Sequence, residues 1–135
     1  MKLIIGNKRY SSWSLRPWLG LKVAGIPFEE ELHDIYDPGA AADRARWSPT
    51  GKVPLLADGE LLVWDTLAIA EYVAERFPDR GLWPAGRAAR AIARAACAEM
   101  HSGFVALRAA HPMDMKKREQ VEASPAVRAD LARLE

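Results

Sequence analysis

Two short strand-like runs with a helix-like segment between them constrain the start of the chain most. Residues 2–6 form an apolar run, and residues 28–35 alternate apolar and polar side chains as strands do. The segment at about 14–24 has the spacing of a helix and ends at Gly25, before Pro27. Strands joined through a helix run parallel, so this part of the sequence predicts a right-handed β-α-β unit.

A second pair of apolar runs predicts a hairpin. Residues 53–57 and 61–64 are separated by Asp58-Gly59, and a glycine there suits the positive φ of a tight turn. Pro54 has no N–H to donate to a sheet. We therefore expect Pro54 at the start of an edge strand or of a strand with a functional role.

The remaining signals up to residue 78 complete a recognisable order of elements. Residues 40–46 predict a short helix, and Asp65-Thr66 supplies the cap of a helix that ends near Phe77. The predicted order over residues 1–78 is β-α-β-α-β-β-α. This order is typical of an α/β thioredoxin-like fold, in which helices flank a four-stranded mixed sheet.

The rest of the sequence predicts helices only. Glycines and prolines at 79–86 indicate a linker, and residues 87–135 are expected to form a second, all-α domain. An Ala-rich helix is expected from Arg87 to about Leu107, and Ser124-Pro125 begins another with the usual cap signals. Two helices bury little apolar surface by themselves, so we expect this domain to be incomplete.

Composition narrows the function. The chain has 135 residues and a net charge of +1, which gives no general attraction to nucleic acid or to a membrane surface. No apolar run is long enough to span a membrane. The single cysteine, Cys97, excludes an internal disulfide, fits a cytoplasmic location and is expected to pack as a small hydrophobe in its Ala-rich helix. His33, His101 and His111 lack metal-ligand spacing, so we expect no metal.

The loop before the first helix is the strongest candidate for a functional site. Residues 10–16 read Tyr-Ser-Ser-Trp-Ser-Leu-Arg, and they place the hydroxyls of Ser11, Ser12 and Ser14 at or just before the first turn. Free backbone N–H groups and the helix dipole suit a small anion there, and a thiolate is one candidate. The alternative is that Ser14 is only an N-cap and the other two serines are ordinary loop residues.

With these motifs in order, the chain resembles the glutathione transferases. The resemblance rests on residues 11–14, on Gly-Lys-Val-Pro-Leu at 51–55, and on Asp-Thr at 65–66 followed by Leu-Ala-Ile-Ala-Glu-Tyr. It covers residues 1–80 well and 87–110 more loosely. The serine run is most similar to the serine-using zeta class and its bacterial relatives. Zeta members with maleylacetoacetate isomerase activity have Ser-Ser-Cys where this chain has Ser-Ser-Trp, which argues against that activity here.

The resemblance implies where glutathione and its sulfur bind. A hydroxyl, first Ser11 and next Ser12, is expected to donate to the sulfur and favour the thiolate, while Ser14 is expected to be the cap. The Val53-Pro54 bond is expected to be cis and to present the backbone of Val53 to glutathione like an added strand.

The same resemblance implies roles for residues around that loop. Asp65 and Thr66 are expected to hold the γ-glutamyl end of glutathione at a helix N-terminus, Lys52 to meet the glycyl carboxylate, and Trp13 to contact the tripeptide. Arg16 faces either the site or a subunit interface. The electrophile pocket is assigned His101, Ser102 and Arg108, which are equally compatible with plain helix surface.

The implied function is that of a cytoplasmic, dimeric glutathione transferase active in detoxification. It would add the thiolate of glutathione, as co-substrate, to a small hydrophobic electrophile. Two other functions remain open: a non-enzymatic binding or assembly module of the same fold, and a zeta-like glutathione-dependent isomerase. A thiol–disulfide oxidoreductase needs a cysteine at 11–14, and this chain has none there.

Overall fold

The order of helices and strands agrees with the fold class predicted from the sequence. The structure, a computed structural model, describes residues 1–135. In chain order it contains β1 (Lys2–Ile5), α1 (Ser12–Val23), β2 (Glu29–Leu32), α2 (Ala40–Trp47), β3 (Leu55–Asp58), β4 (Leu61–Trp64), α3 (Thr66–Arg76), a 3-10 turn η1 (Pro78–Arg80), α4 (Arg87–Ser102), α5 (Val105–Ala110) and α6 (Pro125–Leu134). The part up to α3 is thioredoxin-like, and a helical region follows it. The exact domain boundaries stay a prediction.

The four strands form one mixed sheet in the order β2-β1-β3-β4. β1 and β2 are parallel, with Leu3 beside Glu30, and β3 is antiparallel to both β1 and β4. The predicted β-α-β unit and hairpin are therefore confirmed. Of the two alternatives for the strand after Pro54, an edge strand is wrong, because β3 is internal, and a strand with a functional role stays a prediction. Pro54 is tolerated since it precedes Leu55, the first residue of the strand, and removes no sheet hydrogen bond.

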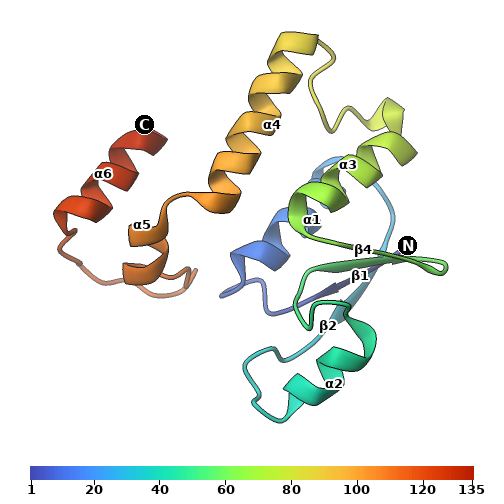
Figure 1. The fold of residues 1–135 in the computed structure, drawn as a ribbon, viewed down its shortest axis with the longest axis horizontal. Coiled ribbons are helices and arrows are strands. Elements are labelled where there is room, and N and C mark those ends of the chain that lie inside the picture. Colours follow the sequence, from blue (N-terminus) through green and yellow to red (C-terminus); the bar gives the residue numbers. More distant parts are fainter.

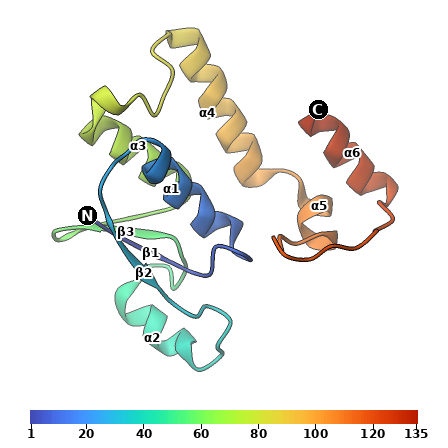
Figure 2. The same ribbon diagram turned by 180° about the vertical axis from the view of Figure 1, so that it is seen from behind.

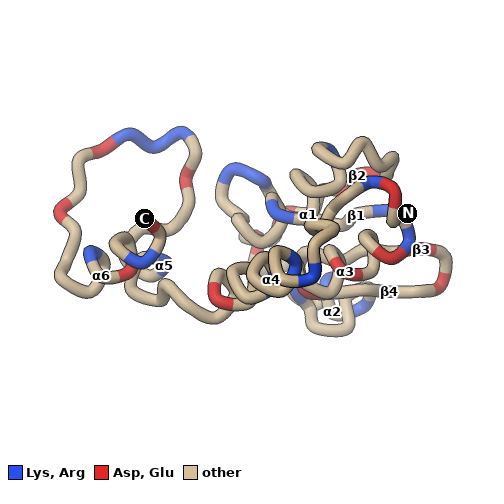
Figure 3. The backbone as a smooth tube through the Cα atoms, turned by 90° about the horizontal axis from the view of Figure 1, so that it is seen from above, with Lys and Arg blue, Asp and Glu red and all other residues tan.

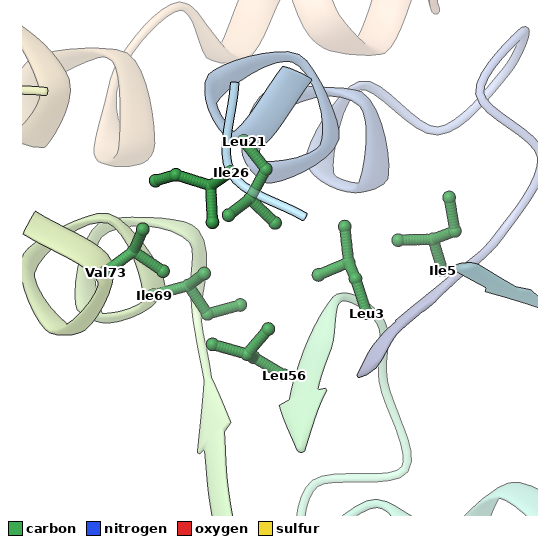
Figure 4. Packing of buried hydrophobic residues seen from close by; sticks show 7 residues of the cluster. All are labelled: Leu3, Ile5, Leu21, Ile26, Leu56, Ile69 and Val73. Atoms are coloured by element: carbon green, nitrogen blue, oxygen red, sulfur yellow. The ribbon is translucent and has the colours of Figure 1, made fainter. Parts of the chain in front are cut away.

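The helices cover the sheet on both sides. α1 and α3 lie side by side against one face, and α2 lies on the other side (Figures 1 and 2). The core lies between the sheet and the α1–α3 pair, where side chains from strands and helices point toward one another (Figure 4). Its members are all apolar and buried: Leu3, Ile5, Leu21, Ile26, Leu56, Ile69 and Val73. Each contributes about 1.5–3 kcal/mol by leaving water, which holds α1 and α3 in place.

The helical region is less tightly packed. α4 leads away from the sheet, and α5 and α6 pack on each other at the far end (Figures 1 and 2). No residue of α4 is buried. Cys97 is exposed and borders an apolar cavity of about 360 Å³ between α1, α3 and α4. The prediction that Cys97 packs as a small hydrophobe is therefore wrong, because Cys97 borders this open cavity and remains exposed.

The helix predicted from Arg87 to Leu107 is two helices with a break at Gly103-Phe104. Phe104 adopts a left-handed conformation, with φ of 60°, and its side chain is buried. A side chain at Gly103 would come within 2.8 Å of the carbonyl oxygen of Glu99, so only glycine allows the chain to turn so closely. The apolar spacing continues through the break, which is why the sequence predicted a single helix.

The distribution of charged and apolar residues in the structure agrees with the low net charge and the absence of a long apolar run in the sequence. Lys and Arg are interspersed with Asp and Glu along the backbone, with no large region of one sign (Figure 3). None of the helices combines the length and the apolar character that a membrane span requires.

Candidate functional site

Two cavities that share Trp13 lie beside the start of α1. The first, which we call the Lys52 cavity, has a volume of about 370 Å³. The second, the serine cavity, has a volume of about 520 Å³ and includes Ser11 and Ser12 in its lining. The indole of Trp13 borders both, so the two cavities adjoin at the N-terminus of α1.

The Lys52 cavity gathers most of the residues that the sequence assigned to glutathione. Its lining includes Trp13, Lys52, Val53, Pro54, Asp65 and Thr66. His101, assigned to the electrophile pocket, lines this cavity instead. Sequence reasoning missed Thr50 and Trp64, which also line it. Both residues directly precede a motif assigned to glutathione, at 51–55 and at 65–66, and this adjacency could have identified them.

The segment before β3 is held by a buried serine. The Ser48 hydroxyl donates to the carbonyl oxygen of Lys52 at 2.8 Å and accepts from the backbone N–H of Lys52 at 3.1 Å. The Val53–Pro54 bond is cis, as predicted. The backbone N–H and C=O of Val53 make no hydrogen bond within the chain. They remain available to a ligand in the Lys52 cavity.

Asp65 combines a cap with an unusual backbone conformation. Its φ is 75°, which is rare for a residue with a side chain and concentrates at functional sites. Its Oδ1 accepts from the N–H of Leu67 at 2.9 Å, so Asp65 is the N-cap of α3, as predicted. Its Oδ2 lies 3.3 Å from Nδ1 of His101. The N-terminus of α3 and a carboxylate therefore border the same cavity.

Two of the three serines, Ser11 and Ser14, are hydrogen-bonded to each other at the start of α1. Ser11, not Ser14, is the N-cap: its Oγ accepts from the N–H of Ser14 at 3.2 Å. The Ser11 hydroxyl also lies 2.9 Å from Ser14 Oγ, to which it donates. Ser14 is fully buried and accepts the N–H of Gly6 at 3.0 Å. The expectation that Ser14 caps the helix is wrong, because α1 begins two residues earlier and the Ser14 hydroxyl is needed by Gly6.

An ion pair ties this loop to the helical region. The guanidinium of Arg9 donates twice to Asp114, from Nε at 2.6 Å and from Nη2 at 3.1 Å. The same guanidinium holds the pKa of the Asp114 carboxyl below its usual value. The backbone N–H of Met115 also donates to the carbonyl oxygen of Arg9 at 3.3 Å. These contacts place the segment after α5 against the loop between β1 and α1, which we call the serine loop.

The remaining walls of the serine cavity are mainly apolar. Aromatic and sulfur-containing side chains come from the serine loop, from Tyr36 and from the helical region: Tyr10, Tyr36, Met100, Phe104 and Met113. Arg108, assigned to this pocket by the sequence, lines it, and so does Arg16. Ser102 lines neither cavity. It is exposed, and its hydroxyl donates to the carbonyl oxygen of Ala98 at 3.1 Å.

Comparisons with known proteins agree with this architecture. Residues 10–76 match the family model of the glutathione S-transferase N-terminal domain. A dichloromethane dehalogenase of Methylorubrum extorquens is 47% identical over 60 residues, which are 43% of this chain and 21% of that protein. A probable maleylacetoacetate isomerase of Caenorhabditis elegans is 34% identical over 94 residues, 69% of this chain and 42% of that protein. The chain thus spans less than half the length of these relatives.

A solved structure extends the likeness to the whole chain. The glutathione S-transferase of a sphingomonad, complexed with glutathione, superposes with a TM-score of 0.72 at 27% identity. The superposition covers 99% of this chain and 68% of that one. The chain therefore belongs to the glutathione S-transferase family through its N-terminal domain.

Proposed function

We propose that the chain binds glutathione in the Lys52 cavity and presents its thiolate to an electrophile in the serine cavity. The observation that carries this proposal is the shared wall at Trp13. One side offers groups suited to a charged peptide, and the other offers hydroxyls and apolar walls. A transferase needs those two environments to meet at the reacting sulfur, since catalysis comes largely from holding the reactants together.

Each end of glutathione has a complementary group in the Lys52 cavity. The γ-glutamyl carboxylate fits the N-terminus of α3 at Thr66, where N–H groups lack helical partners. Its amino group faces the carboxylate of Asp65. The backbone of Val53 pairs with the cysteinyl residue, and the exposed ammonium of Lys52 meets the glycyl carboxylate.

The sulfur then lies where Trp13 adjoins the serines, and Ser11 is the first candidate donor. A free thiol has a pKa of about 8.5 and is mostly protonated at neutral pH. One hydrogen bond to the charged form is worth roughly 1.5–3 kcal/mol, which lowers that pKa by about one to two units. The Ser11 hydroxyl donates its hydrogen bond to the sulfur, instead of to Ser14, when the Ser14 hydroxyl turns and donates to Ser11 in return. Ser14 can do so because the two oxygens lie 2.9 Å apart.

Ser12 is the second candidate. It is the first residue of α1, lines the serine cavity and makes no side-chain hydrogen bond within the chain. Its hydroxyl is therefore free to donate without any rearrangement. Variants of the two serines, described in the Discussion, decide between them.

We further propose that the protein forms a homodimer through β4. β4 is an edge strand, and its Leu61, Leu62 and Trp64 side chains are exposed. Leu62 and Trp64, together with Leu67 and Ala68 of α3, border a mainly apolar depression. Exposed edge strands with large apolar side chains usually pair or become covered. Replacing Leu61 and Leu62 by glutamate should convert a dimer to a monomer in sedimentation; an unchanged sedimentation coefficient would contradict this surface.

A non-enzymatic binding module is the second candidate function. The observation that favours it is the open packing of the helical region, since no residue of α4 is buried. Binding and turnover separate the two functions. Calorimetry with glutathione tests the Lys52 cavity, and a rate assay with an activated aryl chloride tests transfer. Binding with turnover supports the transferase, binding without turnover supports the module, and a folded chain that binds no glutathione rejects both.

A further inference from the structure

The indole of Trp13 gathers two guanidinium groups at the serine cavity. Cζ of Arg16, from α1, lies 4.2 Å from the centroid of the ring, and Cζ of Arg108, from α5, lies 5.1 Å from it. Neither arginine forms an ion pair with a carboxylate. Two positive charges therefore share one aromatic support without a negative partner.

Arg16 is the less satisfied of the two. Its guanidinium, with five N–H donors, makes no hydrogen bond within the chain. Burial lowers the pKa of this guanidinium, and the positive charge of Arg108 lowers it further. A partly buried cation beside a like charge is unfavourable on its own, and such groups concentrate at binding and catalytic sites.

Arg108 is anchored but keeps donors free. Its Nε donates to the carbonyl oxygen of Gly103 at 3.1 Å, and its Nη2 donates to the carbonyl of Met100. These bonds close the C-terminal end of α4 and fix the direction of the guanidinium. Nη1 makes no hydrogen bond, so one edge of the group remains available at the cavity.

The carboxylates on neighbouring elements are engaged elsewhere. Asp114 pairs with Arg9, Asp65 caps α3 and faces His101, and Glu99 pairs with Arg133 of α6. No Asp or Glu lines the serine cavity, whereas Arg16, Arg108 and His111 do. The cavity in which the electrophile is proposed to bind is therefore basic as well as apolar.

We propose that the electrophile of this chain is an organic acid, whose carboxylate binds to Arg16 and Arg108 while its unsaturated or aromatic body lies against the apolar walls. This inference rests on the proposed function, because it names the substrate class of the same site. Guanidinium groups bind carboxylates through paired N–H donors, and a carboxylate would relieve the repulsion between the two arginines. Glutathione is not the anion in question, since its own carboxylates are assigned to the Lys52 cavity.

An activated aryl chloride is a suitable test substrate, because glutathione replaces its chlorine in a simple substitution. The thiolate sulfur of glutathione adds to the ring carbon that carries chlorine, and the carbon–sulfur bond forms. The carbon–chlorine bond then breaks, and chloride leaves with the electron pair. The thiol proton has already gone to solvent. A carboxylate on the far side of the ring takes no part in these steps, so it tests binding alone.

The experiment compares 4-chloro-3,5-dinitrobenzoate with its carboxamide, which differs in charge but not in shape. The specificity constant for each is divided by the uncatalysed rate with free glutathione, which removes the intrinsic difference in reactivity. We expect the acid to be favoured about tenfold or more, as one charge-assisted hydrogen bond would give. Arg16→Gln should remove most of this preference, because it should lower the specificity constant for the acid far more than that for the carboxamide.

Matched variants exclude indirect effects. Arg16→Lys keeps the charge and should retain part of the preference. Arg87→Gln, at the N-terminus of α4, removes the same charge from an exposed residue whose side chain makes no hydrogen bond or ion pair, and it should not change the preference. Arg108→Gln should reduce the preference as Arg16→Gln does. Arg108→Lys keeps the charge but loses the hydrogen bonds to the carbonyls of Gly103 and Met100. A preference retained in Arg108→Lys attributes the effect to the charge, and a preference lost in it attributes the effect to those hydrogen bonds.

Binding of the unreactive 3,5-dinitrobenzoate, measured by calorimetry in the presence of glutathione, gives a readout that needs no turnover. Tighter binding of the acid than of its amide, lost in Arg16→Gln, supports the proposal. Equal binding of acid and amide overturns it. Slowing of both aryl chlorides to the same extent by Arg16→Gln also overturns it, because the arginines would then serve the thiolate. Failure of the proposed function shows itself separately, as absence of glutathione binding.

Discussion

The hydroxyl oxygens of Ser11 and Ser14 lie 2.9 Å apart at the start of α1, and this pair connects the candidate site to the sheet. Ser14 accepts the N–H of Gly6, which follows β1, while Ser11 faces the serine cavity. The hydroxyl that would meet the sulfur is thus positioned by a buried neighbour rather than by the loop alone. This arrangement makes the roles of the two serines separable by experiment.

Replacing Ser11 by alanine should raise the pKa of the thiol in bound glutathione by about one to two units, because one hydrogen bond to the thiolate is lost. The ultraviolet absorbance of the thiolate, followed during a pH titration, measures this. Ser11 is also an N-cap, so about 1 kcal/mol of stability should be lost as well. Ser124→Ala removes the matching cap of α6 and should lower stability without changing the thiol. An unchanged thiol pKa in Ser11→Ala, with a raised one in Ser12→Ala, would transfer the role to Ser12.

Replacing Ser14 by alanine should destabilise the fold more than Ser11→Ala does. The N–H of Gly6 would be left buried without an acceptor, which costs about 1–3 kcal/mol. Because Ser14 donates to Ser11 in the proposed thiolate state, the pKa of bound thiol should also rise, though less than in Ser11→Ala. Urea unfolding gives the first quantity and the absorbance titration the second. A stability loss with no change in the thiol pKa would reduce Ser14 to a purely structural residue.

The fold was largely predictable because each element carries a local signal. Gly25 ends α1, Asp58-Gly59 makes the hairpin, and Asp65 caps α3 through its own side chain. The cis bond at Val53–Pro54 was inferred from a resemblance and not from such a signal. Local signals state where an element begins and ends, and the pairing of strands follows from chain order.

Features that depend on long-range packing were not predictable in the same way. No local signal shows that the Ser14 hydroxyl is needed by Gly6, since Ser14 lies eight positions further along the chain, beyond a turn. The assignment of Ser102 to the pocket failed for a similar reason, because the direction of its side chain depends on how α4 is oriented relative to the cavities. Trp13 was the exception: its place beside the serines was enough to single it out.

Two glycine substitutions should act in opposite directions. Gly103→Ala places a Cβ 2.8 Å from the carbonyl oxygen of Glu99, so the turn between α4 and α5 must shift, at a cost of about 1–3 kcal/mol. Gly20→Ala, inside α1, meets nothing within 4 Å and should stabilise by about 0.5–1 kcal/mol through helix propensity. Denaturant unfolding of both variants measures the difference. Equal effects would show that the close approach at Gly103 does not hold the break in place.

The ion pair between α3 and α4 should make the free energy of unfolding depend on pH in the acid range. Nε and Nη2 of Arg94 donate to the two carboxylate oxygens of Glu71 at 2.6 and 2.7 Å. This pairing holds the pKa of the Glu71 carboxyl below its usual value. A carboxyl with a lowered folded-state pKa stabilises the fold above its unfolded pKa of about 4.3, and that contribution is lost as pH falls through the folded value.

Glu71→Gln should therefore lower the free energy of unfolding by about 0.5 kcal/mol at neutral pH, a small amount because the pair is partly exposed. The difference from the unmodified chain should shrink to near zero once the pH is below the lowered pKa of Glu71. Urea unfolding across a pH series provides the measurement. Glu60→Gln, in the β3–β4 turn, removes a carboxylate that has no ion pair and serves as the control. A Glu71→Gln effect that persists undiminished in acid would mean that Glu71 stabilises α3 through packing rather than through its ion pair with Arg94.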